Sequence, residues 1–223
     1  HIKKNKIPGK IIILDPKPKI APIGEGYKAA FEELYPDIIT HVPNAVVKEV
    51  DPFNKKIKTA AGEFTFDDAV LMPPHQASDM VWYADLIGKD ENGKPTGWAD
   101  MHPRLFTANS DDNVYFVGDC MGMISDQFGH YPKSGHVAHA IAKIVSQNLY
   151  ERITGKEIVP VLPDNLCYMM VNGDPQEEIS VKFEYEVDAT GKVLQTQIDM
   201  DVRSTDLVQE DFDWIKSRFN DFL

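Results

Sequence analysis

A short stretch of the chain places a carboxylate where α/β proteins hold ligands. Residues 114–117 are apolar or aromatic, which predicts a buried strand covered on both faces. Gly118 and Asp119 follow directly, so the backbone can turn away at the glycine and the acid lies at the carboxyl end of the strand. A carboxylate there can accept hydrogen bonds from ribityl or ribose hydroxyls, whereas it would repel a phosphate.

A helix is expected to begin shortly afterwards, at Lys133, Ser134 and Gly135. The apolar positions that follow have helical spacing, namely Val137, Ile141, Ile144, Val145 and Leu149. The first turn of a helix presents unpaired N–H groups and the positive end of the helix dipole, and Lys133 adds a full charge. Together these groups could stabilise the negative charge that develops on N1 and O2 of a flavin. The alternative is an ordinary strand, loop and capped helix with a surface lysine.

The chain also contains two cysteines and seven histidines. Cys120 directly follows Asp119 and is expected to be a packing residue, and two cysteines alone do not establish a disulfide. Three histidines are close in sequence, at His130, His136 and His139. No cysteine or carboxylate at ligand spacing completes that set, so no metal site is predicted.

Residues 113–149 resemble the carboxyl-terminal, flavin-contacting motif of the disulfide-reductase-like flavoproteins. Farther along, Asn165-Leu166-Cys167-Tyr168 resembles the Asn-x-Cys-Tyr box in the flavoprotein subunit of flavocytochrome c sulfide dehydrogenase. Other segments are similar to that subunit: KIIILDPKP at 10–18, ELYPDI at 33–38, LMPPHQAS at 71–78 and GWADMHPRLF at 97–106. The resemblance covers nearly the whole chain, and its most specific parts are the Asn-x-Cys-Tyr box and the Pro-Lys-Ser-Gly at 132–135.

The resemblance implies an FAD-dependent oxidoreductase that oxidises sulfide or a related sulfur compound. It implies contacts with the ribityl, pyrophosphate or pyrimidine parts of FAD for Gly118, Asp119, Lys133, Ser134 and Gly135. By the same resemblance, Cys167 is one half of a redox disulfide above the flavin ring; sulfide attacks the disulfide, and two electrons enter the ring. The electrons would leave through a c-type cytochrome subunit in the periplasm.

Two other functions remain open. Sulfide:quinone oxidoreductase is the close relative in activity, but such membrane-bound enzymes usually have an apolar, amphipathic carboxyl terminus. The last helix expected here carries Asp211, Asp213 and Asp221, which favours a soluble electron acceptor. A hypothesis of another class is a non-catalytic assembly module that binds a partner through its acidic carboxyl-terminal part.

The sequence departs from the family pattern in two places. The family's G-x-G-x-x-G loop is missing, and Gly24-Glu25-Gly26, the nearest approach to it, lacks the third glycine. We therefore expect the carboxyl-terminal portion of such a flavoprotein, inactive in isolation, with the partner of Cys167 outside this chain. An unfinished surface would favour a homodimer or weak FAD retention. The loop 121–130 is also longer than the family's spacing.

Charge and composition exclude several classes. The chain has 223 residues, 43% hydrophobic content and a net charge of −12, which suits a globular protein and argues against nucleic-acid binding. Residues 174–223 contain thirteen acidic and five basic residues, so this part could steer a basic partner such as a cytochrome or could simply be a solvated surface. No apolar run approaches the roughly 20 residues of a membrane span, and residues 1–6 are not followed by the apolar core of a signal peptide.

The predicted fold class is α/β: a partial flavoprotein of the type with two dinucleotide-binding domains, plus a small α+β carboxyl-terminal cap domain. Residues 1–108 are assigned to a nicotinamide-type domain that has lost its cofactor, 109–155 to the end of an FAD domain, and 156–223 to the cap. In the first part we expect buried strands at 11–14 and 69–72, a helix through 27–34 that Pro36 ends, and meander strands at 46–50, 57–59 and 63–66.

The cap is expected to contain two strands and a helix. Residues 179–187 alternate between apolar and polar, Asp188 to Gly191 form a hairpin turn, and 193–200 return as a strand. Asp206 is expected to cap a terminal helix. The apolar stripe of that helix is predicted to be core: Val208, Phe212, Ile215, Phe219 and Phe222.

Overall fold

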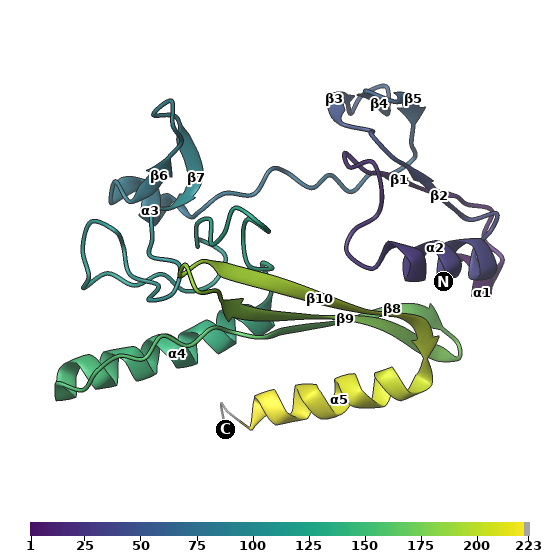
Figure 1. The fold of residues 1–223 in the computed structure, drawn as a ribbon. Helices are drawn as coiled ribbons and strands as arrows, with labels where there is room; N and C mark the ends of the chain where they lie inside the picture. Colours follow the sequence, from purple (N-terminus) through teal and green to yellow (C-terminus); the bar gives the residue numbers. More distant parts are fainter. Residues whose placement is uncertain (221–223) are drawn as a thin grey trace. The chain divides into compact units, whose positions relative to one another are not determined.

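The computed structural model describes residues 1–220, which form a mixed α/β fold with several small sheets (Figure 1). The chain divides into two compact units: unit 1 contains residues 1–72, 167–181 and the described part of 199–223, and unit 2 contains 73–166 and 182–198. These units are discontinuous in sequence, so they do not follow the three predicted parts. The assignment of those parts to flavoprotein domains stays a prediction.

Unit 1 begins with α1 (Ile2–Asn5), β1 (Ile11–Leu14), α2 (Gly24–Leu34) and β2 (Ile39–Val42). Strands β1 and β2 pair in parallel, from Ile11 opposite Ile39 to Leu14 opposite Val42. The predicted strand and helix are therefore confirmed. The expected burial of β1 is wrong, because β2 is the only strand that pairs with it among residues 1–220 and Ile12 is 45% exposed.

The meander predicted after this pair is confirmed. It consists of β3 (Val47–Asp51), β4 (Lys56–Thr59) and β5 (Gly62–Thr65), which pair antiparallel in sequence order. The strand predicted at 69–72 is wrong, since these residues form no strand and Val70 is 90% exposed. A strand needs a backbone partner on at least one side, and the apolar run alone does not supply one.

A three-stranded sheet and a final helix supply the rest of unit 1. The strands are β8 (Asn165–Gly173), β9 (Gln176–Val187) and β10 (Val193–Ser204), in the order β10-β9-β8, and their residues 167–173, 176–181 and 199–204 belong to unit 1. In unit 1, Asp201 of β10 accepts a hydrogen bond from the backbone N–H of Gly26 in α2 at 2.7 Å. The final helix α5 (Thr205–Phe219) is tied to β8 by Tyr168, which donates to Glu210 at 2.6 Å.

The carboxyl-terminal predictions are confirmed in outline, but they missed strand β8 and are wrong in two further details. The hairpin turn forms, because the Asp188 carboxylate accepts from the backbone N–H groups of Thr190 and Lys192. The cap of α5 is Ser204 rather than Asp206, since Ser204 Oγ accepts from the Asp206 N–H at 3.0 Å.

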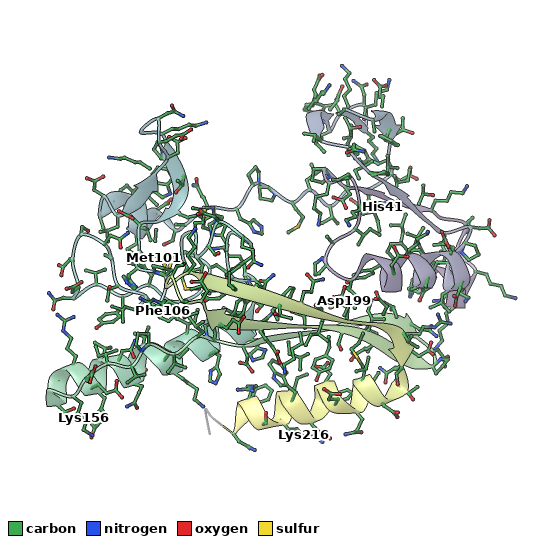
Figure 2. All side chains as sticks on the ribbon, viewed as in Figure 1. His41, Met101, Phe106, Lys156, Asp199 and Lys216 are labelled. Carbon is green, nitrogen blue, oxygen red and sulfur yellow. The ribbon has the colours of Figure 1, made fainter. Side chains whose placement is uncertain are left out.

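The apolar stripe of α5 is only partly core. Val208 is buried, but Phe212 is 50% and Phe219 60% exposed, and Phe222 lies outside the described residues. Figure 2 shows the side chains along this helix near the labelled Lys216.

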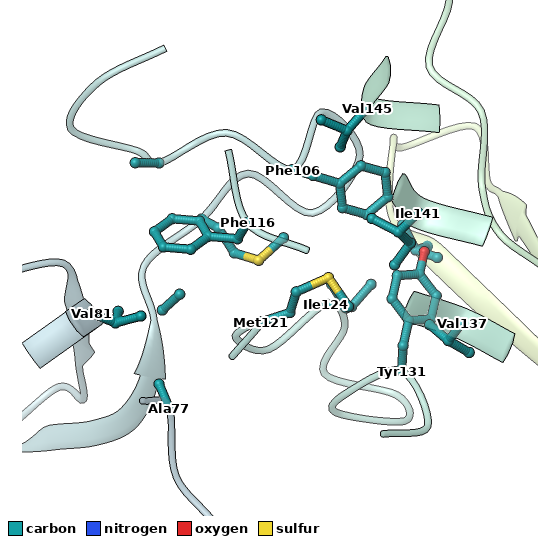
Figure 3. Close-up of a cluster of buried hydrophobic side chains, with 14 residues drawn as sticks. Ala77, Val81, Phe106, Phe116, Met121, Ile124, Tyr131, Val137, Ile141 and Val145 are labelled. Atoms are coloured by element: carbon teal, nitrogen blue, oxygen red, sulfur yellow. The ribbon is translucent and has the colours of Figure 1, made fainter. Parts of the chain in front are cut away.

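Unit 2 contains α3 (Asp79–Tyr83), a hairpin of β6 (Ile87–Lys89) and β7 (Pro95–Ala99), and the long helix α4 (Gly135–Thr154). Its core is built on α4, whose Val137, Ile141 and Val145 face Phe106 and Tyr131 (Figure 3). Phe106 and Ile141 are fully buried. The helix predicted from apolar spacing is confirmed, and this core fixes where its first turn lies.

The strand predicted at 114–117 is wrong. The segment makes only an isolated antiparallel bridge, between Tyr115 and Thr107, and the Phe116 N–H donates to the Phe106 carbonyl at 2.8 Å. Its backbone thus pairs on one side with residues 106–108, which is too short a ladder to form a sheet strand. The turn at Gly118 nevertheless follows it, with φ of +81°.

Candidate flavin site at the start of α4

The start of α4 is held by a serine cap. Ser134 Oγ accepts from the backbone N–H of Val137 at 3.3 Å, which satisfies one of the free donors in the first turn. The same hydroxyl donates to Oδ1 of Asn165 at 3.1 Å, and Asn165 is fully buried. The cap is therefore fixed from two sides, within unit 2.

Lys133 is the cation next to this helix start. Its Nζ donates to the Met121 carbonyl at 2.7 Å and lies 3.9 Å from the centroid of the Trp98 ring. Burial lowers the pKa of Lys133, while the charges of Asp119 and Cys120 act in the opposite direction. The ammonium is thus partly desolvated and lies near an acidic turn.

The Gly118–Cys120 turn lies against the same helix end. A Cβ built on Gly118 would lie 3.8 Å from the Cβ of Ala138, in the first turn of α4. Asp119 is exposed, so its carboxylate is accessible to a ligand. Cys120 is half-buried, and burial raises the pKa of its thiol. The structure therefore brings Gly118 and Asp119 to Lys133.

Gly135 leaves the helix end open. It is exposed, and a Cβ built on it would meet no atom within 4 Å. The backbone of Gly135 can therefore be approached from outside, and the dipole of the 20-residue helix favours a negatively charged or electron-rich group there. A helix start, a lysine and an exposed acid fit the polar edges of a flavin and its ribityl chain.

Three residues that support this site were not predicted as site residues. Trp98 contacts Lys133, Asn165 binds the cap, and His136 is buried with Nδ1 accepting from the Leu166 N–H at 3.0 Å. The other ring nitrogen of His136, Nε2, lies 3.5 Å from Oδ1 of Asp164. The only sequence signal for Trp98 and Asn165 was their presence in segments that carried the resemblance.

The other histidines do not form a metal centre. The His130 ring packs on Trp98 in a tilted arrangement, with a centroid distance of 5.4 Å and an interplanar angle of 54°, and burial lowers the pKa of His130. Among residues 1–220, no group of three or more histidine, cysteine or acidic side chains is arranged to hold a metal ion.

The long loop 121–130 packs closely on β7. A Cβ built on Gly122 would be 2.0 Å from the Ala99 carbonyl oxygen, so only glycine fits. The Ala99 N–H also donates to the Cys120 carbonyl at 3.0 Å. The loop 121–130, which is longer than the corresponding loop of the resembling flavoprotein family, is thereby fixed beside Trp98.

Cys167 belongs to unit 1, whereas the residues around the start of α4 belong to unit 2. Cys167 is half-buried in β8. The pKa of Tyr27 in α2 is raised, first by the burial of Tyr27 and then by the charge of Cys167. Neither Cys167 nor Cys120 forms a disulfide within the described residues. The predicted place of Cys167 above a flavin stays a prediction.

No protein-family model matches the chain, and no curated protein sequence matches it. Among the described residues, no helix is long and apolar enough to cross a membrane.

Proposed function

We propose that this chain is the carboxyl-terminal portion of an FAD-dependent oxidoreductase that oxidises sulfide or a related sulfur compound. The observation that carries the proposal is the meeting of the Gly118–Cys120 turn, Lys133 and the open first turn of α4 within one compact unit. Bound FAD would supply the two-electron redox chemistry. The chain's own residues bind and orient it.

Each residue has a defined part in this binding. The N–H groups at Gly135 and the charge of Lys133 stabilise negative charge at the pyrimidine edge of the flavin. A charge at a helix start is stabilised by about 0.3–1 kcal/mol at exposed positions. The exposed carboxylate of Asp119 accepts from hydroxyls of the ribityl chain, and Gly118 lets the backbone approach closely.

The remaining parts of the proposal rest on the sequence. Cys167 acts as one redox thiol, and a basic c-type cytochrome in the periplasm takes the electrons, guided by the acidic segment 174–223. A quinone is the alternative acceptor. A homodimer would cover surface that FAD-domain residues outside this chain otherwise cover.

One observation favours a second function, that of an assembly module. On α5, Phe212 and Phe219 are half-exposed or more, beside acidic residues such as Asp213. Aromatic side chains are enriched at protein interfaces, and acidic side chains around them can steer a basic partner. In that case the chain binds a partner without catalysing a reaction.

The test is a titration of FAD into the 223-residue chain, followed by flavin fluorescence and equilibrium dialysis. The diagnostic variant is Gly135→Leu, which places a bulky side chain at the open helix start without an internal clash. The matched control is Gly173→Leu, because Gly173 is equally exposed and equally free of neighbours within 4 Å, but lies in unit 1.

The proposal predicts that the Gly135→Leu variant binds FAD about tenfold more weakly or worse, and that Gly173→Leu binds like the parent chain. Bleaching of the bound flavin by sulfide would support the enzyme. If the parent chain binds no FAD, or if both variants bind it like the parent, the flavin proposal is wrong. A chain without flavin that captures a c-type cytochrome would support the assembly module instead.

A further inference from the structure

Lys133 has an aromatic neighbour that neither the sequence motif nor the proposed function accounts for. Its Nζ lies 3.9 Å from the centroid of the Trp98 ring and donates to the Met121 carbonyl at 2.7 Å. The face of an indole ring carries negative potential and attracts a cation within about 6 Å. The ring and the carbonyl together therefore stabilise the charged form of a lysine that is partly removed from water.

The backbone at Trp98 is held beside the loop 121–130. The next residue, Ala99, is bonded through its N–H to the Cys120 carbonyl and touches Gly122 too closely for any side chain there. The His130 ring contacts the indole in a tilted arrangement, with the ring centroids 5.4 Å apart. The backbone at Trp98 is thus fixed beside the segment that contains Met121, and His130 contacts one side of the indole.

We propose that Trp98 is a positioning residue of the α4 site, whose indole face and the Met121 carbonyl hold the Lys133 ammonium charged and in place for an anionic or electron-rich ligand. One N–H of the ammonium is used by Met121, so others remain to donate to the ligand. The role of this arrangement in flavin binding rests on the proposed function, whereas the effect of Trp98 on the charge of Lys133 does not depend on it.

The experiment measures the titration of Lys133 in the chain without added flavin. Lysines are acetylated briefly at a series of pH values, and mass spectrometry gives the midpoint for each lysine. The variants are Trp98→Leu, which removes the π face, and Trp98→Phe, which keeps a ring. The control is Tyr150→Leu, which removes the ring under Lys156, the exposed cation–π pair near the other end of α4.

Trp98→Leu is expected to lower the Lys133 midpoint by roughly 0.5–1 pH unit, as expected for the loss of a partly desolvated cation–π contact. Trp98→Phe should largely restore it, and Tyr150→Leu should leave it unchanged. Circular dichroism confirms that each variant is folded. A Lys133 midpoint that stays constant or rises in Trp98→Leu overturns the inference.

FAD titration then separates the two proposals. If the parent chain binds FAD, Trp98→Leu should weaken that binding several-fold and Trp98→Phe much less. Equal FAD affinity in all three chains overturns the positioning role while leaving the flavin site standing. A shifted Lys133 midpoint in a chain that binds no FAD supports the effect of Trp98 on Lys133 and refutes the proposed function.

Discussion

The Ser134→Ala substitution is predicted to weaken α4 more than a typical lost helix cap would. Ser134 makes two hydrogen bonds, one accepted from Val137 N–H and one donated to the buried Asn165. An N-cap serine contributes about 1 kcal/mol, and a hydrogen bond to a buried polar group contributes about another 1 kcal/mol. The loss in Ser134→Ala is therefore expected to be about 2 kcal/mol.

Ser204→Ala provides the comparison. Ser204 caps α5 through a single bond, accepted from the Asp206 N–H at 3.0 Å, so its loss should cost about 1 kcal/mol. Native-state hydrogen exchange with mass spectrometry reads the opening free energies of residues 135–154 and 205–219 separately. If Ser134→Ala lowers the protection of α4 by no more than Ser204→Ala lowers that of α5, the bond to Asn165 contributes nothing and the reasoning is refuted.

Three further substitutions, the last with a control at Phe53, test the packing and the electrostatics. Glu178 is 3% exposed and has a carboxylate oxygen without a hydrogen-bond partner among residues 1–220; burial, and then the charge of Asp211, raise the pKa of Glu178. A raised folded-state pKa gives stability that is complete below the unfolded pKa and is lost as pH rises through the folded pKa. In urea unfolding, Glu178→Gln should therefore gain stability relative to the parent chain as the pH rises from 4 to 8. A difference in unfolding free energy between variant and parent that stays the same over this range would contradict the prediction. Gly122→Ala should destabilise unit 2 by roughly 1–3 kcal/mol because its Cβ would meet a backbone oxygen at 2.0 Å. An unfolding temperature equal to that of the parent chain would contradict this close approach. Phe106→Ala should cost about 3–5 kcal/mol, whereas Phe53→Ala, at a side chain 95% exposed, should cost almost nothing in the same urea assay; equal losses would refute the assigned core.

Local pattern was enough to predict the helices α2, α4 and α5 and the hairpin between β9 and β10, but α1, α3 and the β6–β7 hairpin were not predicted. The helical spacing that begins at Val137 predicted α4, and the acid and glycine at residues 188–191 predicted the turn between β9 and β10. In these elements the residues that decide the structure are neighbours in sequence. The same holds for the β3–β5 meander, where short turns bring the strands together.

Strand burial could not be predicted in the same way. The apolar runs at 69–72 and 114–117 resemble central strands, yet one has no strand partner and the other has only residues 106–108. A central strand is defined by its two neighbours, which a pattern within the strand does not specify. Phe212 and Phe219 illustrate the same limit on a helix, because spacing shows which side chains share a face but not what covers that face.

The flavin site stays a prediction, and its candidate residues were those that a backbone pattern in the sequence can indicate. A helix start and a glycine turn can be recognised from sequence, so Gly118, Asp119, Lys133, Ser134 and Gly135 were identifiable as candidates. Trp98, Asn165 and His136 reach this site only through folding. Their residue types are as common in ordinary cores as in binding sites.

The most direct test of the account is a two-dimensional ¹H–¹⁵N spectrum of the chain recorded during a titration with FAD. The account predicts saturable shifts that are largest for the amides of residues 118–120 and 133–137, with little change at the start of α5. Binding that shifts other amides and leaves the start of α4 unchanged, or no shift at any FAD concentration, would contradict the claim that this helix start and its neighbouring acidic turn bind a flavin.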